Sequence, residues 1–212
     1  MSNFVNENLV RFETIEVSGF DTSMEGMRNP MNSWSKNDSY YDDDNFIIGD
    51  NDINLTQRLI KGGSEECKHI RMINVGVNIF LPRYVWSEFD TYNFNTKCSC
   101  STMHKLLIDG LTEKDFIYHE SDKFLLDLSI TKINLLAEEY RTCKNYEKQK
   151  ELIRRAKALL HEGYIQKRTV MINYQELRNM IKQRKNHRLT EWNEIFIKWC
   201  KSLPYADEIL FY

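Results

Sequence analysis

The chain has 212 residues, and its 29 basic (Lys or Arg) and 31 acidic (Asp or Glu) side chains give a formal net charge of −2. Eight Gly and three Pro exclude a collagen-like or low-complexity chain, and 4 Trp, 11 Tyr and 11 Phe argue against global disorder. No apolar run approaches the roughly 20 residues of a membrane span, and residues 1–13 lack the regions of a signal peptide, so we expect a cytoplasmic protein without membrane association.

At this length we expect a single domain, residues 1–212, whose first part, 1–120, is rich in sheet. The β-branched and aromatic content of Leu9–Val17 is typical of a strand. A short helix is expected at Phe20–Met27, because an Asn-Pro turn follows it. The polar and acidic stretch 33–52 is expected to be a loop.

The middle of the chain contains the clearest predicted strand. Asp52 can cap a helix that runs to Ile60. In Arg71–Leu81 every second side chain is a large aliphatic one, so one face of this strand should lie in the core. Pro82 ends the strand and can begin a helix that reaches Asp90.

The second part, 121–212, is predicted to be helical. Four helices are expected, at 122–140, 146–162, 173–184 and 190–203. The first should bury one stripe of leucines, Leu125, Leu128, Leu135 and Leu136, and the last should bury an aromatic stripe, Trp192, Ile195, Phe196, Trp199 and Leu203. The predicted fold class is α+β, with a central, mostly antiparallel sheet packed against the helical second part.

Charge is distributed unevenly along the chain. Residues 1–120 carry a net charge of −8, residues 121–212 a net charge of +6, and the stretch 141–188 alone carries +10. A basic segment in a nearly neutral protein indicates an anionic partner, although a solvated helix face is an equally plain interpretation.

The five cysteines do not predict a disulfide framework, because their number is odd and their spacing is irregular. One set of residues could be considered as a zinc site: Cys67, His69, Cys98, Cys100 and His104. Neither short pair has the usual spacing of two to four residues between cysteines, so we expect no metal. Cys143 and Cys200 fall on apolar helical stripes and are expected to be buried thiols.

No phosphate-binding loop, dinucleotide fingerprint, nucleophile elbow or zinc-protease motif occurs. What remains is a set of polar residues around the third predicted helix. Asn173 begins that helix, Asn179 lies six residues later, and Arg184 lies near its end. A simple N-cap would by itself account for Asn173.

The stretch from Arg154 to Arg188 resembles the C-terminal motif of the flavin-dependent thymidylate synthases. In that family an Ala-Arg and a Leu-Pro pair precede an extended segment, then Asn-x-Arg-x-Leu, a His or Asn, and an Arg eleven residues after the first Asn. The matching positions here are Ala156-Lys157, Leu160-His161, Asn173, Leu177, Asn179 and Arg184. Gln175 replaces the arginine of Asn-x-Arg, and Lys68-His69 resembles the Glu-His that opens the family's central strand.

The resemblance implies a central-sheet α/β fold, usually a homotetramer with sites between subunits. It also implies FAD and a dUMP-like pyrimidine nucleotide as ligands, with methylene-tetrahydrofolate and NADPH as co-substrates. By position, His69, Asn173 and Asn179 would contact the flavin, and Lys157 would pair with the nucleotide phosphate. Arg184 would contact the nucleotide and take part in catalysis.

The family's central signature, Arg-His-Arg followed after seven residues by Ser, is absent. The best register places Thr91-Tyr92-Asn93 at the Arg-His-Arg positions and Ser101 at the serine, where it would contact the nucleotide. Threonine cannot replace a phosphate-binding arginine without loss of charge-assisted hydrogen bonds of about 1.5–3 kcal/mol each. The segment from Trp86 to His104 also resembles a group of phage-encoded proteins.

Three functions therefore stay open at this point. The first is a divergent flavin-dependent enzyme of the thymidylate-synthase type, and the second is a non-catalytic nucleotide-binding module with the same fold. The third, nucleic-acid binding through the basic stretch, is the least expected because the total charge is near neutral. The sequence assigns no role to Arg28 or Trp34, nor a firm one to Thr91–His104.

Overall fold

The structure is a computed structural model that describes residues 3–212. The chain divides into two compact units. Unit 1 comprises the described residues up to Arg11 together with 79–91 and 98–168, and unit 2 comprises 12–78, 92–97 and 169–212.

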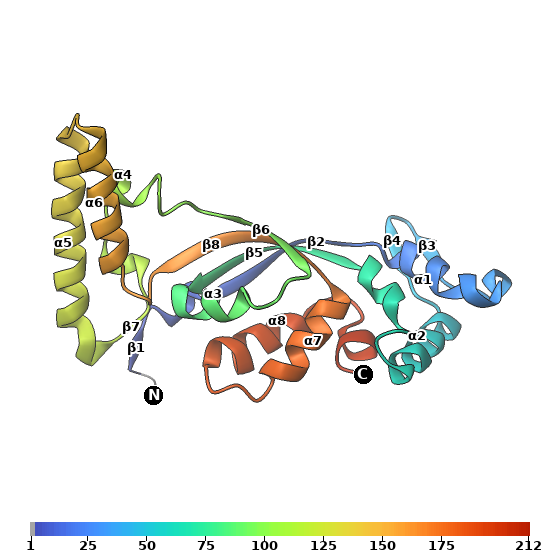
Figure 1. The fold of residues 1–212 in the computed structure, drawn as a ribbon. Coiled ribbons are helices and arrows are strands. Elements are labelled where there is room, and N and C mark those ends of the chain that lie inside the picture. Colours follow the sequence, from blue (N-terminus) through green and yellow to red (C-terminus); the bar gives the residue numbers. More distant parts are fainter. Residues whose placement is uncertain (1–2) are drawn as a thin grey trace. The chain divides into compact units, whose positions relative to one another are not determined.

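The strands form one four-stranded sheet and two short antiparallel ribbons (Figure 1). The order in the larger sheet is β2 (Arg11–Ser18), β5 (Asn74–Pro82), β8 (Ile165–Asn173) and β6 (Asn95–Ser99). The ribbons pair β1 (Phe4–Val5) with β7 (Tyr118–His119), and β3 (Tyr40–Asp42) with β4 (Asn45–Ile47). The predicted fold class, α+β with antiparallel sheets, is confirmed.

Strand β5 carries the predicted apolar face. Val75, Val77, Ile79 and Leu81 are buried, whereas Asn74, Asn78 and Phe80 are partly exposed. The strand begins later than predicted, because residues Lys68–Met72 form a 3₁₀ turn (η4). The predicted loop 33–52 is also more ordered than expected, since it contains the ribbon of β3 and β4 and the first turn of a helix.

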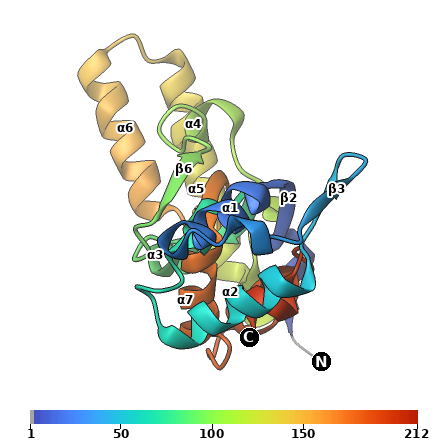
Figure 2. The same ribbon diagram turned by 90° about the vertical axis from the view of Figure 1, so that its right-hand side faces the viewer.

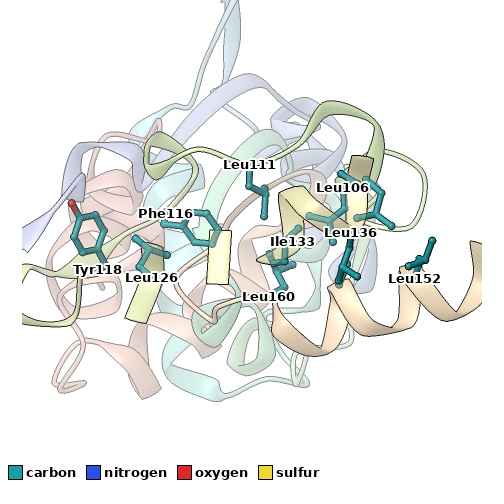
Figure 3. Packing of buried hydrophobic residues seen from close by; sticks show 12 residues of the cluster. Leu106, Leu111, Phe116, Tyr118, Leu126, Ile133, Leu136, Leu152 and Leu160 are labelled. Atoms are coloured by element: carbon teal, nitrogen blue, oxygen red, sulfur yellow. The ribbon is translucent and has the colours of Figure 1, made fainter. Parts of the chain in front are cut away.

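The helices of unit 1 are α3 (Arg83–Phe89), α4 (Leu106–Asp109), α5 (Lys123–Thr142) and α6 (Tyr146–Leu159). Helices α5 and α6 lie side by side (Figure 1, Figure 2), and α4 contacts both. Their facing sides form an apolar cluster that includes Leu126, Ile133, Leu136 and Leu152 (Figure 3).

The leucine stripe predicted for α5 is wrong at three of its four positions. Leu136 is buried, but Leu125, Leu128 and Leu135 are 63%, 53% and 53% exposed. Apolar residues occur on both sides of this helix, so periodicity alone cannot select the buried side. Contact with α4 and α6 selects the side that carries Leu126 and Ile133.

The helices of unit 2 are α1 (Phe20–Arg28), α2 (Asp50–Gly62), α7 (Tyr174–Arg184) and α8 (Ile197–Lys201). Residues Glu191–Phe196 precede α8 as a π-helical turn, and a second such turn spans Ala206–Leu210. The aromatic stripe near the C-terminus is buried at four of its five predicted positions, Trp192, Phe196, Trp199 and Leu203, whereas Ile195 is partly exposed.

Asp52 is not the predicted N-cap of α2, because Gly49 occupies that position. Its carboxylate lies buried inside the first turn and pairs with the Arg28 guanidinium, whose Nε lies 2.7 Å from Oδ1. The Ser39 hydroxyl donates to the other carboxylate oxygen. Arg28 therefore joins α1 to α2, and the exposed Trp34 donates its indole N–H to Asn29 nearby. Both residues have structural partners that the sequence did not reveal.

Among residues 3–212, no helix is long and apolar enough to cross a membrane.

Candidate functional site

Unit 2 contains a cavity of about 320 Å³ where strand β8 ends and helix α7 begins. Its lining residues come from four short segments: Ser64, Arg71, Phe94, Asn173, Gln175, Glu176 and Asn179. Two of the three predicted flavin contacts, Asn173 and Asn179, are thus brought to one cavity. Amides, one cation, one carboxylate and one aromatic ring are a small set of polar groups of the kind that orients a ligand.

Asn173 is the N-cap of α7. Its Oδ1 accepts a hydrogen bond from the backbone N–H of Glu176 at 3.0 Å, which satisfies one of the free donors of the first turn. The N-cap interpretation of this residue is therefore correct. The N-cap hydrogen bond involves only the side-chain oxygen of Asn173, so the N–H₂ group of the same amide remains available to a ligand in the cavity.

Asn179 belongs to a chain of hydrogen bonds that runs along the cavity wall. The Cys67 thiol donates to Gln175 at 3.2 Å, Gln175 Nε2 donates to Asn179 Oδ1 at 3.4 Å, and Asn179 Nδ2 donates to Glu176 at 3.3 Å. Gln175 and Glu176 are buried. Bonds of 3.3–3.4 Å are at the long limit for N–H···O contacts, so a ligand can replace them at small cost.

Arg71 and Phe94 are site residues that the sequence analysis missed. Both side chains are exposed, and Phe94 is 74% exposed beside the cavity. An exposed aromatic ring at a cavity rim can stack on a planar ligand, and a nearby guanidinium can pair with a phosphate. The available signal was the position of Arg71, two residues after the predicted flavin contact His69.

His69 does not line this cavity. It is buried in η4, and neither ring nitrogen has a hydrogen-bond partner among residues 3–212. Burial lowers the pKa of His69 to about 4, since a charged imidazolium would lose its hydration. The ring is therefore neutral at pH 7. Two unpartnered ring nitrogens in a buried site are unusual and mark this residue for direct study.

Arg184 lies at the C-terminal end of α7 against two aromatic rings. Its Nε donates to the Tyr92 hydroxyl at 2.8 Å, and its guanidinium carbon lies 4.6 Å from the ring centre of Trp192. Tyr92 in turn donates to Gln183 at 2.9 Å. Arg184 does not line the cavity of Asn173 and Asn179.

The other two predicted nucleotide contacts belong to unit 1. Lys157 lines a cavity of about 310 Å³ together with two other cations, Arg83 and Arg168. Ser101 lies in a loop, and its hydroxyl accepts the backbone N–H groups of residues 103 and 104 at 3.2 Å. These local hydrogen bonds stabilise the loop and account for the serine without any ligand.

The residues that line the cavity in unit 2 could hold part of a flavin. No group of three His, Cys, Asp or Glu side chains suited to a metal ion occurs in the described part of the chain. The amides of Asn173 and Asn179 offer donors and acceptors to a ring edge, Phe94 offers a ring face, and Arg71 offers a cation.

Two solved structures of the flavin-dependent thymidylate synthase ThyX from Helicobacter pylori, both with FAD and dUMP, have a similar fold. One shares 18% sequence identity with this chain at a TM-score of 0.68, and the match covers 95% of this chain and 97% of the ThyX chain. The other shares 17% identity at a TM-score of 0.68 with the same coverage. No family model and no curated protein matches the sequence. At this level of identity the likeness shows a common fold.

Proposed function

We propose that this protein is a divergent relative of the flavin-dependent thymidylate synthases that binds a flavin and a pyrimidine nucleotide. The observation that carries the proposal is the placement of Asn173 and Asn179 in one cavity of unit 2. The resemblance in sequence assigned both residues to the flavin. The shared fold of the two ThyX structures, which hold FAD and dUMP, supports the same assignment.

This chain lacks the Arg-His-Arg signature, but the cavity contains other groups that can bind a ligand. Arg71 places a guanidinium beside the two asparagines, and Gln175 replaces the family's arginine at a position where the Cys67 thiol holds its amide oxygen. FAD, when bound, would supply hydride transfer. The chain's own residues would bind the ring edge through amides, cover one face with Phe94 and neutralise a phosphate with Arg71.

For the nucleotide, the proposal keeps Arg184 as the contact to the pyrimidine and Lys157 as the contact to the phosphate, with Ser101 as a further contact. Methylene-tetrahydrofolate and NADPH are the proposed co-substrates, and a homotetramer is the proposed assembly. The alternative is a non-catalytic module of the same fold. It is favoured by Thr91 and Asn93, which stand where the family has arginines.

The absorbance spectrum of the purified protein tests the flavin directly. We expect a flavin spectrum, either at once or after addition of FAD and dUMP, and we expect Asn179→Ala to weaken FAD binding about tenfold or more. Arg188→Gln is a matched control, because Arg188 is an exposed residue of the same segment outside the cavity. Protein that stays colourless with FAD and dUMP contradicts the proposal.

Calorimetric titration with dUMP separates the enzyme from the binding module. Both forms of the proposal require dUMP binding that is weakened by Arg184→Ala. Only the enzyme converts dUMP to dTMP when methylene-tetrahydrofolate and NADPH are added. If Arg184→Ala leaves the affinity for dUMP unchanged, the assignment of that arginine is wrong.

A further inference from the structure

The cavity of unit 1 that Lys157 lines carries more positive than negative charge. The charged residues in its wall are Arg83, Asp90, Lys157, Glu162 and Arg168. Three cations against two carboxylates leave a surplus of one positive charge in a space of about 310 Å³. Such a surplus favours an anionic ligand.

Arg168 is the cation of this cavity whose position is best fixed. It belongs to strand β8 and packs on Trp86 of helix α3 (Figure 1), with its guanidinium carbon 4.1 Å from the centre of the buried ring. Gln166, two residues earlier on the same side of β8, accepts from Arg168 Nε and Nη2 at 3.3 and 3.2 Å. The guanidinium is therefore oriented by its neighbours and does not need a ligand to order it.

The remaining edge of this guanidinium faces a carboxylate that water can reach. Arg168 Nη1 donates to both oxygens of Asp90, at 2.8 and 3.0 Å. The Arg168 side chain is 14% exposed, whereas Asp90 is 44% exposed, so water can solvate this carboxylate when another anion takes its place. A phosphate group presents a similar pair of oxygens to a planar guanidinium.

Arg83 is less suited to this role. It pairs with Glu162 at the longer distance of 3.3 Å, and its side chain is 33% exposed. A mobile cation loses more conformational entropy when it binds a ligand than one that is already held in place.

We propose that Arg168 binds the phosphate group of the nucleotide together with Lys157, and that the nucleotide displaces Asp90 from the Nη1 edge. The inference rests on the proposed function, which assigns the phosphate to Lys157. Residues 91–93 contain no cation, so strand β8 supplies the guanidinium from a distant part of the chain. Asp90 is then a competitor of the ligand that belongs to the protein itself.

Calorimetric titration of the full chain with dUMP tests the role of Arg168. Arg168→Gln should weaken dUMP binding about tenfold, since it removes a charge-assisted contact. The loss of affinity between 50 and 500 mM NaCl should also be smaller in this variant than in the wild type.

Asp90→Asn provides a test of opposite sign. It removes the competing charge and leaves the contacts of Arg168 with Trp86 and Gln166 in place, so dUMP should bind several-fold more tightly. In the Arg168→Gln background the same substitution should give a much smaller gain, because the gain acts through Arg168. An equal gain in both backgrounds overturns the proposal.

Arg155 and Glu151 provide the matched control, because they form an ion pair at 3.9 Å on α6 and do not line the cavity. Arg155→Gln and Glu151→Gln should leave the affinity for dUMP unchanged. An equal loss of affinity in Arg168→Gln and Arg155→Gln overturns the proposal.

Failure of this inference differs from failure of the proposed function. A wild-type protein that does not bind dUMP contradicts the nucleotide part of the proposed function, and the role of Arg168 falls with it. If the wild type binds dUMP and Lys157→Gln weakens binding but Arg168→Gln does not, only the role of Arg168 is wrong.

Discussion

The two units bury different kinds of side chain. All nine buried polar or charged residues of the described chain belong to unit 2: Ser23, Arg28, Asp52, Thr56, His69, Gln175, Glu176, Arg178 and Glu191. The core of unit 1 is an apolar cluster, and its ion pairs are at least partly exposed. Burial of a polar group is costly unless it is partnered, so unit 2 depends on specific hydrogen bonds in a way that unit 1 does not.

The same difference separates the two candidate sites. In unit 2 the cavity-lining amides of Gln175 and Asn179 are held by a chain of buried and partly buried hydrogen bonds that begins at Cys67. In unit 1 the cavity that Lys157 lines contains two further cations, Arg83 and Arg168, and each of these forms an ion pair with a carboxylate. The first arrangement favours recognition of a ring edge, and the second favours attraction of an anion.

The largest effect is expected where unit 2 buries an ion pair. Arg28→Met leaves the Asp52 carboxylate buried without its cation, so the free energy of unfolding should fall by about 3–5 kcal/mol. Urea unfolding followed by circular dichroism measures this. Lys123→Met removes the exposed ion pairs with Glu113 and Asp127 in unit 1, and should lower the free energy of unfolding far less. Equal effects of the two variants would abolish the contrast between the units.

A comparably large effect is expected in the apolar core of unit 1. Leu126→Ala opens a cavity at a fully buried position of α5 and should destabilise the protein by about 3 kcal/mol. Leu128→Ala changes the same residue type two positions later, where the side chain is 53% exposed, and should cost less than about 0.5 kcal/mol. Reversed values in urea unfolding would mean that the other side of α5 is the buried one.

Burial of His69 in unit 2 adds a pH dependence to the stability of the protein. Because its folded-state pKa, about 4, is below the ordinary value of 6.5, the unfolded chain binds more protons between these values. Stability should therefore be complete above pH 6.5 and fall as the pH drops toward 4. Between pH 7 and pH 5, the free energy of unfolding, measured with urea, should fall by about 2 kcal/mol more for the wild type than for His69→Gln. Parallel pH profiles for the two proteins would show that His69 is not held neutral.

The smallest effect is expected at the Arg184 contact. Tyr92→Phe removes the hydroxyl that accepts from Arg184 Nε, but leaves the guanidinium against the Trp192 ring. Stability should fall by about 1 kcal/mol. The affinity for dUMP, measured by calorimetry, should also fall if Arg184 contacts the nucleotide. A loss of stability with unchanged affinity would make the contact purely structural.

Several local features were predictable because they depend on neighbouring residues alone. The apolar alternation of β5, the end of that strand at Pro82 and the N-cap at Asn173 follow from sequence order and backbone hydrogen bonding. The positions of Asn173 and Asn179 at the start and middle of α7 also followed from the pattern. Their common cavity required in addition that Arg71 and Phe94 approach from other segments.

What the sequence by itself determined was the fold class, the apolar alternation of β5 and the N-cap of α7 at Asn173. Tertiary structure alone decided which face of α5 is buried, that Asp52 pairs with Arg28 rather than capping its helix, and which carboxylate pairs with Lys148 of α6. The physical reason is the range of the interactions. Periodicity and capping act within a few residues, whereas burial and charge compensation depend on partners that are distant in the chain and come together only on folding.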